Sequence, residues 1–473
     1  MLYKKVELSS LIKAIDFKKN NTNYIPLTLV SESSLREWEK AASKFHQEWL
    51  KSHNFDCQKE TPLILPNEKG EISKILYGLK DKNIPTNPYF YSKLASQLPI
   101  GRYEITNSLS KNIAFQVILG WGLSHYQFDK YKKNSSLTLK TLKAPKGVEK
   151  SKLGAILKAI KIIRDLINTP TNDLGPKELS NFSRALAKEN KASFKEIIGE
   201  DLLKKGFPTI HAVGRASIEK PRLIDFTWGK KSAPKVTLVG KGVCFDTGGL
   251  GIKPSGGMRW MKKDMGGAAH ALGLASAIMD LNLPIRLRVI IPAVENSISS
   301  NSFRPGDIIK SRKGINIEVG HTDAEGRLIL CDTLALADEE SPDLLIDFAT
   351  LTGAARVALG PDLPALFTND DECANNLVNL GAEYSDPMWR MPLWQPYNDD
   401  IKSSIADINN IGEGGLGGAI TAALFLERFV KNANVWAHLD LFGWSNKAIP
   451  GRPRGGEAQT VRSILSFIEN RYC

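Results

Sequence analysis

Four carboxylates in three glycine-rich segments are the residues of this chain best suited to chemistry. The segments are G-K-G-V-C-F-D-T-G-G-L-G-I-K-P (residues 240–254), M-K-K-D-M-G-G-A-A (residues 261–269) and H-T-D-A-E-G-R-L (residues 321–328). Together they supply the acids Asp246, Asp264, Asp323 and Glu325 and the bases Lys241, Lys253 and Arg327. The glycines beside them let the backbone turn sharply and approach a ligand closely.

Carboxylates that converge on one place repel one another unless positive charge lies between them. One or two divalent cations meet that need, because oxygen ligands suit several such ions. Two metals roughly 3.5–4 Å apart can share a water and make it a nucleophile near neutral pH. The three basic side chains offer another source of positive charge, and the acids would then serve as salt-bridge partners and loop caps. Spacing alone does not decide between a metal site and a salt-bridge network.

Short apolar runs alternate with helical patterns around these segments, which indicates a largely parallel sheet covered on both faces. The strand-like runs are Val236–Val239, Leu287–Val294, Leu344–Leu351 and Val435–Phe442, and the clearest helical patterns are Ala268–Leu281 and Leu328–Ala337. In such sheets ligands bind just beyond the carboxyl ends of the strands. We therefore expect the chemistry of this protein at that edge.

The length of the chain predicts two domains, because 473 residues exceed what one hydrophobic core usually supports. Residues 1–150 mix short apolar runs with helical stretches such as Ser34–Lys51 and predict a small N-terminal α/β domain. Residues 151–168 predict a connecting helix, since Ala155–Ile167 places apolar residues at helical spacing. Residues 169–473 predict a larger α/β catalytic domain with a mostly parallel central sheet.

The overall composition is that of an ordinary soluble globular protein, with 42% hydrophobic and 24% charged residues. No uncharged apolar run approaches the roughly 18 residues that span a bilayer, and the first residues show no secretion signal. We therefore expect a cytoplasmic protein with no membrane partner. The five cysteines form no C-x-x-C pair and no H-E-x-x-H occurs, so carboxylates must build any metal site.

Positive charge is concentrated in the first domain. Residues 1–150 carry 24 Lys and Arg against 14 Asp and Glu, a balance of +10, whereas the remaining residues carry 39 against 37, a balance of +2. A basic domain can attract nucleic acid. The absence of a nucleic-acid-binding motif favours a lysine-rich solvated surface instead.

The three segments resemble, in order and spacing, the signature blocks of the leucyl aminopeptidase (cytosol aminopeptidase) family of dinuclear metallopeptidases. Further blocks that resemble this family are N-T-P-T-N-D-L-G-P, E-N-S-I, R-P-G-D and A-T-L-T-G-A. The resemblance runs from about residue 165 to the C-terminus. It implies removal of single residues from the N-termini of peptides, two divalent metals per subunit (Zn or Mn), and a homohexamer.

The resemblance also implies roles for the residues of the three segments. Lys241, Asp246, Asp264 and Glu325 would hold the tighter metal, and Asp246, Asp323 and Glu325 the more exchangeable one. Lys253 would be the catalytic lysine, which stabilises the oxyanion as water adds to the scissile carbonyl. Arg327 would hold a bicarbonate that acts as general base. The free amine of the peptide would bind one metal, which accounts for cleavage at the N-terminus.

The resemblance also bears on substrate specificity, because certain positions of the family line the pocket that binds the side chain of the peptide's N-terminal residue. Met261 and Gly353 match such positions, so an apolar first residue such as Leu is expected. The block A-H-L-D-L-F-G-W is bulkier after its aspartate than is usual in the family, and we expect Phe442 to narrow the pocket. His321 stands where the family usually has Asn. It could alter the metal loop, hydrogen-bond the substrate, or be a tolerated neighbour.

Two alternatives to peptide hydrolysis stay open. Oxygen-ligand sites with two metals also serve phosphoryl transfer, so another two-metal hydrolase such as a phosphatase fits the same acids. A DNA-binding or regulatory protein that uses the basic N-terminal domain is the second alternative.

Overall fold

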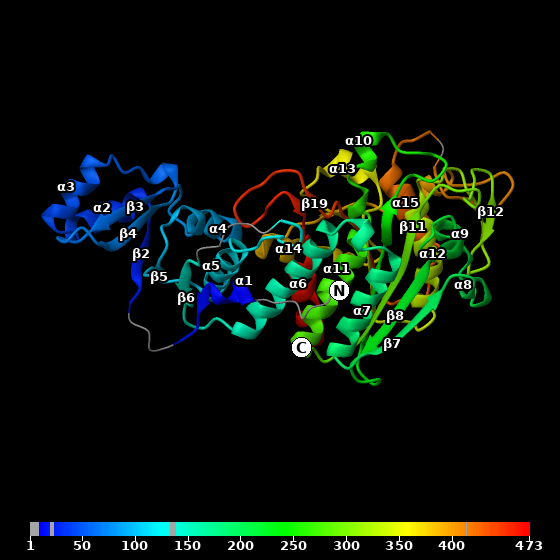
Figure 1. The fold of residues 1–473 in the computed structure, drawn as a ribbon, viewed down its shortest axis with the longest axis horizontal. Coiled ribbons are helices and arrows are strands. Elements are labelled where there is room, and N and C mark those ends of the chain that lie inside the picture. The colour runs from blue at the N-terminus through cyan, green and yellow to red at the C-terminus, as the bar shows by residue number, and fades with distance from the viewer. Residues whose placement is uncertain (1–8, 19–22, 133–138, 413) are drawn as a thin grey trace. The chain divides into compact units, whose positions relative to one another are not determined.

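The computed structural model describes residues 9–18, 23–132, 139–412 and 414–473, and the chain divides into two units (Figure 1). The N-terminal unit runs to Leu157 and also takes in Lys447–Arg454, and the C-terminal unit holds Lys158–Asn446 and Gly455–Cys473. The division falls inside helix α6 (Lys150–Asn168), which covers the predicted connecting helix. The assignment of Lys447–Arg454 to the N-terminal unit had no counterpart in the sequence analysis.

The N-terminal unit is built on a sheet with the strand order β1-β6-β5-β2-β4-β3. Strand β3 pairs antiparallel with β4, and the other described pairs are parallel. The strands are β1 (Ile15–Asp16), β2 (Ile25–Val30), β3 (Pro62–Pro66), β4 (Ile72–Gly78), β5 (Arg102–Ile105) and β6 (Thr141–Lys143). The helices are α1 (Ser9–Lys13), α2 (Glu32–Ala41), α3 (Lys44–Ser52), α4 (Pro88–Gln97) and α5 (Lys111–Leu123).

The predicted helical stretch Ser34–Lys51 forms two helices, α2 and α3, instead of one. The break lies at Ser43, whose side chain accepts a hydrogen bond from the backbone N–H of His46 and so caps α3. Serine is a strong N-cap residue because its oxygen satisfies a backbone donor that the helix leaves free.

The sheet of the C-terminal unit has the strand order β16-β15-β18-β14-β9-β11-β8-β7, and β10 also pairs with β11. The four central strands, β18, β14, β9 and β11, are parallel to one another. At one edge β8 pairs antiparallel with β11, and β7 pairs antiparallel with β8. The strands are β7 (Ser193–Ile198), β8 (Arg222–Trp228), β9 (Lys235–Gly240), β10 (Gly242–Asp246), β11 (Arg286–Asn296), β14 (Leu344–Ala349), β15 (Ala365–Thr368), β16 (Trp389–Arg390) and β18 (Trp436–Asp440).

Short strands outside this sheet form two small pairings. In one, β13 (Asn316–Glu318) lies between β12 (Ile308–Lys310) and β17 (Ile408–Asn409), and in the other β19 (Trp444–Ser445) pairs with β20 (Gly455–Gly456).

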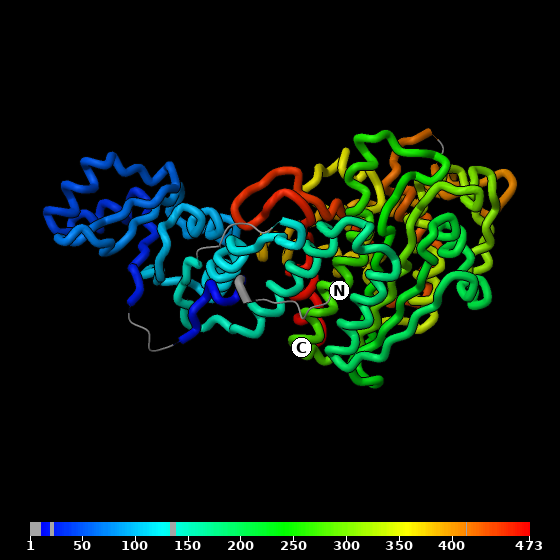
Figure 2. Tube along the Cα trace, viewed as in Figure 1, coloured from blue at the N-terminus to red at the C-terminus, as the bar shows by residue number. Residues whose placement is uncertain are grey.

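Helices cover both faces of the large sheet. The helix α12 packs against β9 and β11 together with α9 and α15, and α11 packs against β9 and β14 with the C-terminal helix α16 beside it (Figure 2). The helices of this unit are α7 (Pro176–Glu189), α8 (Asp201–Lys204), α9 (Pro208–Gly214), α10 (Ser255–Met258), α11 (Gly266–Asp280), α12 (Glu325–Asp338), α13 (Gly353–Leu359), α14 (Asp371–Glu383), α15 (Gly418–Glu427) and α16 (Val461–Tyr472).

The predicted fold class is confirmed. The four apolar runs of the sequence lie in β9, β11, β14 and β18, the parallel centre of the sheet, and the two helical patterns lie in α11 and α12. Every residue of β14 is buried, so this central parallel strand appears in sequence as an apolar run that only the buried Asp347 interrupts. None of the described helices combines the length and the apolar character that crossing a bilayer requires.

Candidate metal centre

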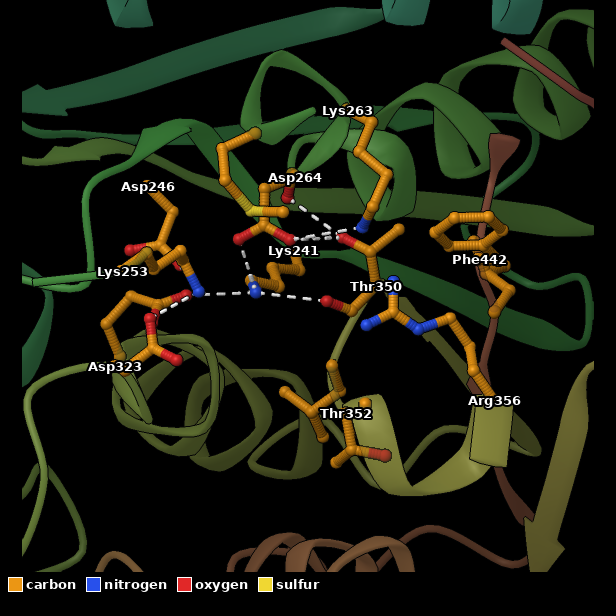
Figure 3. A pocket seen from close by; sticks show the side chains of 15 residues that line it. Lys241, Asp246, Lys253, Lys263, Asp264, Asp323, Thr350, Thr352, Arg356 and Phe442 are labelled. Carbon is orange, nitrogen blue, oxygen red and sulfur yellow. Dashed lines mark hydrogen bonds and ion pairs between the residues drawn. The ribbon is translucent and has the colours of Figure 1, made fainter. Parts of the chain in front are cut away.

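The predicted acids and lysines come together at the carboxyl ends of the central strands (Figure 3). Lys241 follows β9, and Asp246 is the last residue of β10. Asp264 lies just before α11, and Glu325 is the first residue of α12. Because strands and helices alternate along the chain, residues from three distant segments lie together at one edge of the sheet.

Strand β10 places Asp246 because it runs alongside β11 beyond the point where β9 ends. Lys241 lies at the junction of β9 and β10, where its backbone N–H donates to the carbonyl of Phe348 at 2.9 Å. A methyl group at Gly326 would lie 2.6 Å from Cε of Lys241. The glycine of the D-A-E-G-R motif thus leaves room for the lysine side chain beside α12.

Two lysines hold the four carboxylates together. Nζ of Lys241 lies 2.6 Å from Oδ2 of Asp264 and 2.9 Å from Oε1 of Glu325. Nζ of Lys253 lies 2.7 Å from Oδ2 of Asp246 and also contacts Asp323. Two of the three predicted bases therefore pair with the acids.

The acids outnumber these lysines four to two, so negative charge remains when all of them are ionised. Lys263 adds a more distant cation, 3.8 Å from Oδ1 of Asp264. Burial and the charge of Asp264 raise the pKa of Asp246 to about 6. Burial and the charge of Asp246 also raise the pKa of Glu325 well above its usual range. Both shifts show carboxylates whose negative charge is incompletely neutralised by the protein.

Several buried carboxylate oxygens also lack hydrogen bonds. Among the described residues, Oδ2 of Asp264, Oδ1 of Asp323 and Oε1 of Glu325 pair with a lysine ammonium group but accept no other hydrogen bond, and Oε2 of Glu325 accepts none. Oxygens of Asp246, Asp323 and Glu325 lie within 4.8 Å of one another. Buried polar atoms are normally satisfied, and hard divalent cations take oxygen ligands. This donor set therefore fits a divalent metal.

A cavity of about 200 Å³ opens beside these carboxylates. Its wall includes the three predicted substrate-pocket residues, Met261, Gly353 and Phe442. It also includes side chains that the sequence analysis did not identify: Lys263, Thr350, Leu351, Thr352, Arg356 and Leu441. Most of them directly follow the carboxyl ends of β14 and β18, and that position in the chain is the signal that could have identified them.

Arg327 and His321, two residues singled out in the sequence, are not among the residues that line the cavity. Burial lowers the pKa of Arg327 to about 10, and its Nη1 donates to the carbonyl of Asn410 at 2.7 Å. Nδ1 of His321 accepts the backbone N–H of Asp323 at 3.0 Å, so this histidine orders the loop that carries Asp323. A methyl group at Gly251 would lie 2.6 Å from the His321 ring, so glycine makes room for it.

Buried side chains hold in place the backbone of several residues that line the cavity. Asp440 accepts hydrogen bonds from the backbone N–H groups of Leu351 and Thr352 at 3.0 and 3.1 Å, and so holds the segment that enters α13. Oε1 of Gln459 accepts the backbone N–H of Phe442 at 3.2 Å. The N–H of Gln459 in turn donates to Nε2 of His270, a buried core histidine. None of these supports was assigned a role from the sequence.

Comparison with known proteins agrees with this geometry. Residues 161–465 match the model of the cytosol aminopeptidase family, catalytic domain, and residues 25–144 match that of the M17 aminopeptidase N-terminal domain. The chain belongs to the cytosol aminopeptidase family. It is therefore a metal-dependent aminopeptidase, and the resemblance drawn from its sequence motifs is confirmed.

Individual relatives of the family extend the match over both units. The chain is 42% identical over 374 residues to a probable cytosol aminopeptidase of Syntrophotalea carbinolica, with 75% of each chain covered. It is 38% identical over 443 residues to that of Roseiflexus castenholzii, with 87% of this chain and 90% of the relative covered.

Solved structures give the same result. The cytosol aminopeptidase of Coxiella burnetii superimposes with a TM-score of 0.92 at 45% identity, over 97% of this chain and 100% of that one. The bottromycin maturation enzyme BotP in complex with Mn superimposes with a TM-score of 0.84 at 28% identity, over 96% of this chain and 100% of that one.

We predict that Asp264→Ala loses one bound metal ion per chain, because Oδ2 of Asp264 is a buried oxygen that lies 2.6 Å from Lys241, a second proposed ligand of the same ion. Metal content would be measured by mass spectrometry after saturation with Mn²⁺ and gel filtration. Asp307→Ala is the matched control, since Asp307 pairs with Arg304 outside the cavity. Full metal occupancy of Asp264→Ala, together with normal activity, would remove Asp264 from the set of ligands.

Proposed function

We propose that this aminopeptidase uses two divalent metal ions, Zn or Mn, to remove the N-terminal residue of peptides. Lys241, Asp246, Asp264 and Glu325 hold the tighter ion, and Asp246, Asp323 and Glu325 hold the more exchangeable one. The observation that carries the proposal is the group of buried carboxylate oxygens without hydrogen bonds beside a cavity. The complex of the similar enzyme BotP with Mn supports an ion of this kind. When bound, two such ions supply a water activated for attack on the scissile carbonyl.

Lys241 has to lose its proton before it can act as a ligand. Burial lowers the pKa of this lysine, but the charges of Asp264 and Glu325 outweigh burial and raise it above the usual value in the protein alone. Metal binding and deprotonation of a ligand are linked, so Lys241 would give up its proton to solvent when it holds the tighter ion. Lys241 would thus offset the negative charge of the acids as a cation in the metal-free protein, and would act as a neutral nitrogen ligand in the metal-bound one.

Lys253 keeps its charge and stabilises the oxyanion that forms as water adds to the carbonyl. Burial acts to lower its pKa, but the charges of Asp246 and Glu325 raise it overall, which favours the protonated form. It lines the cavity, where its ammonium group can reach the substrate.

Arg327 would hold a bicarbonate, which would supply a general base for the attacking water. Its buried Nε has no hydrogen-bond acceptor among the described residues, which leaves a donor for an anion. This assignment would explain a site in which the lining residues offer no evident neutral base.

An apolar first residue such as Leu is the proposed substrate preference. Met261, Leu441 and Phe442 give the cavity apolar surface that supports it. The cytoplasmic location and the homohexamer are proposed on the family resemblance. The family match favours peptide bonds over the phosphate esters of other two-metal hydrolases.

We predict that purified protein releases p-nitroaniline from Leu-p-nitroanilide, and that dialysis against a chelator abolishes this activity. Zn²⁺ or Mn²⁺ should restore it, because the carboxylates hold the ions that activate water. A phosphate ester assayed in parallel should remain intact. Hydrolysis of the phosphate ester alone would instead support the phosphatase alternative.

We predict that Lys253→Ala retains both metals but loses at least about 100-fold in kcat, the usual effect of removing one oxyanion donor. Metal content and kcat would be measured on the same preparation. An empty metal site in this variant would assign Lys253 to the metal ligands, and unchanged kcat would exclude it from catalysis.

A further inference from the structure

Arg356 brings a positive charge to the cavity at the side away from most of the acids. It lies on α13, one helical turn after Gly353, and both residues line the cavity. Figure 3 shows Arg356 beside Phe442 and Thr352, on the side opposite Asp246 and Asp323. Cζ of its guanidinium lies 4.7 Å from the centre of the Phe442 ring.

Arg356 differs from the other cations of the cavity in its partners. Lys241 and Lys253 each contact two carboxylates, and Lys263 lies 3.8 Å from Asp264. The guanidinium of Arg356 forms neither an ion pair nor a hydrogen bond with any residue that the structure describes. A guanidinium carries five N–H donors in a fork that matches a carboxylate. The cavity therefore presents an unused carboxylate-binding group.

The surroundings of Arg356 define the kind of ligand that reaches it. Met261, Leu441 and Phe442 also line the cavity and supply apolar surface there. A second cation, Nζ of Lys263, lies 5.2 Å from the centre of the Phe442 ring. A side chain that fits this arrangement has methylene groups along its length and a carboxylate at its end. Glutamate and, with one methylene fewer, aspartate have this form.

We propose that Arg356 is a specificity-determining residue that binds the side-chain carboxylate of an acidic N-terminal residue. The cavity then accepts N-terminal Glu and Asp in addition to apolar residues. A leucine side chain contacts the apolar wall but leaves the guanidinium without a partner, whereas a glutamate side chain satisfies both. This inference rests on the proposed aminopeptidase activity.

The α-carboxylate of a short peptide is a second source of the same chemical group. A dipeptide carries that carboxylate beyond the scissile bond, whereas a glutamyl side chain carries it before the bond. Aminoacyl p-nitroanilides lack an α-carboxylate, so a preference for Glu among them has to come from the side chain. Comparing Leu-Leu with Leu-Leu-amide tests the other source.

The experiment measures kcat/KM of the metal-loaded enzyme for the p-nitroanilides of Glu, Gln and Leu. Glu and Gln have nearly the same shape, so their ratio isolates the charge. We expect the wild-type enzyme to favour Glu over Gln by about tenfold or more, as hydrogen bonds to a charged group suggest. We expect this ratio to fall with added salt, because screening weakens a partly exposed charge pair.

Variants at position 356 distinguish the effect of losing the positive charge from the effect of disturbing the fold. Arg356→Met should lower the Glu-to-Gln ratio to near one, because the positive charge is lost while an unbranched side chain stays in its place. Arg356→Lys keeps the charge without the fork and should retain part of the preference. Arg304→Met is the matched control, because Arg304 pairs with Asp307 outside the cavity.

Each outcome bears on a different claim. Hydrolysis of Leu with a Glu-to-Gln ratio near one, unchanged in Arg356→Met, would overturn this inference and leave the proposed function intact. A preference for Leu-Leu over Leu-Leu-amide that disappears in Arg356→Met would also overturn it, in favour of the α-carboxylate. Failure to hydrolyse any of the three p-nitroanilides would contradict the proposed function itself.

Discussion

The gathering of four carboxylates, three of them buried, at one edge of a parallel sheet is the constraint on which the rest of the site depends. Asp246, Asp264 and Glu325 are each at most 3% exposed, so water does little to screen their charges from one another. The protein offsets part of this repulsion with Lys241 and Lys253, and the remainder selects for metal cations. The fold supports the arrangement because its parallel strands all end at the same edge.

Sequence patterns predicted the centre of the fold and the acids and lysines that gather at its edge for related reasons. Buried parallel strands produce mostly apolar runs, so β9, β11, β14 and β18 were evident, as were the motifs that follow or lie between them. The antiparallel edge strands β7 and β8 were not predicted. Their residues are only partly buried, as the intermediate exposure along β7 shows, and such strands lack a distinctive apolar run. The short strand β10 lies within the first glycine-rich motif, which obscured it.

The side chains that support the cavity lining were harder to predict from the sequence, because they act through contacts between residues distant in the chain. Asp440 holds the segment before α13, although nearly 90 residues separate it from Thr352. His270 supports Phe442 through Gln459, a chain of contacts that no local pattern reveals. Arg356 could have been identified from helix periodicity, since it follows Gly353 by three residues on α13. That spacing places both residues on one face of the helix.

The central claim is that these buried carboxylates hold two metal ions, and crystals grown with Mn²⁺ would test it most directly. Anomalous scattering should reveal two peaks per chain. One should contact Lys241, Asp264 and both Asp246 and Glu325, and the other should contact Asp323 and the same two shared acids. Absence of any peak near these acids, at a Mn²⁺ concentration that supports activity, would contradict the account. The site would then consist of lysine–carboxylate ion pairs and bind no metal ion.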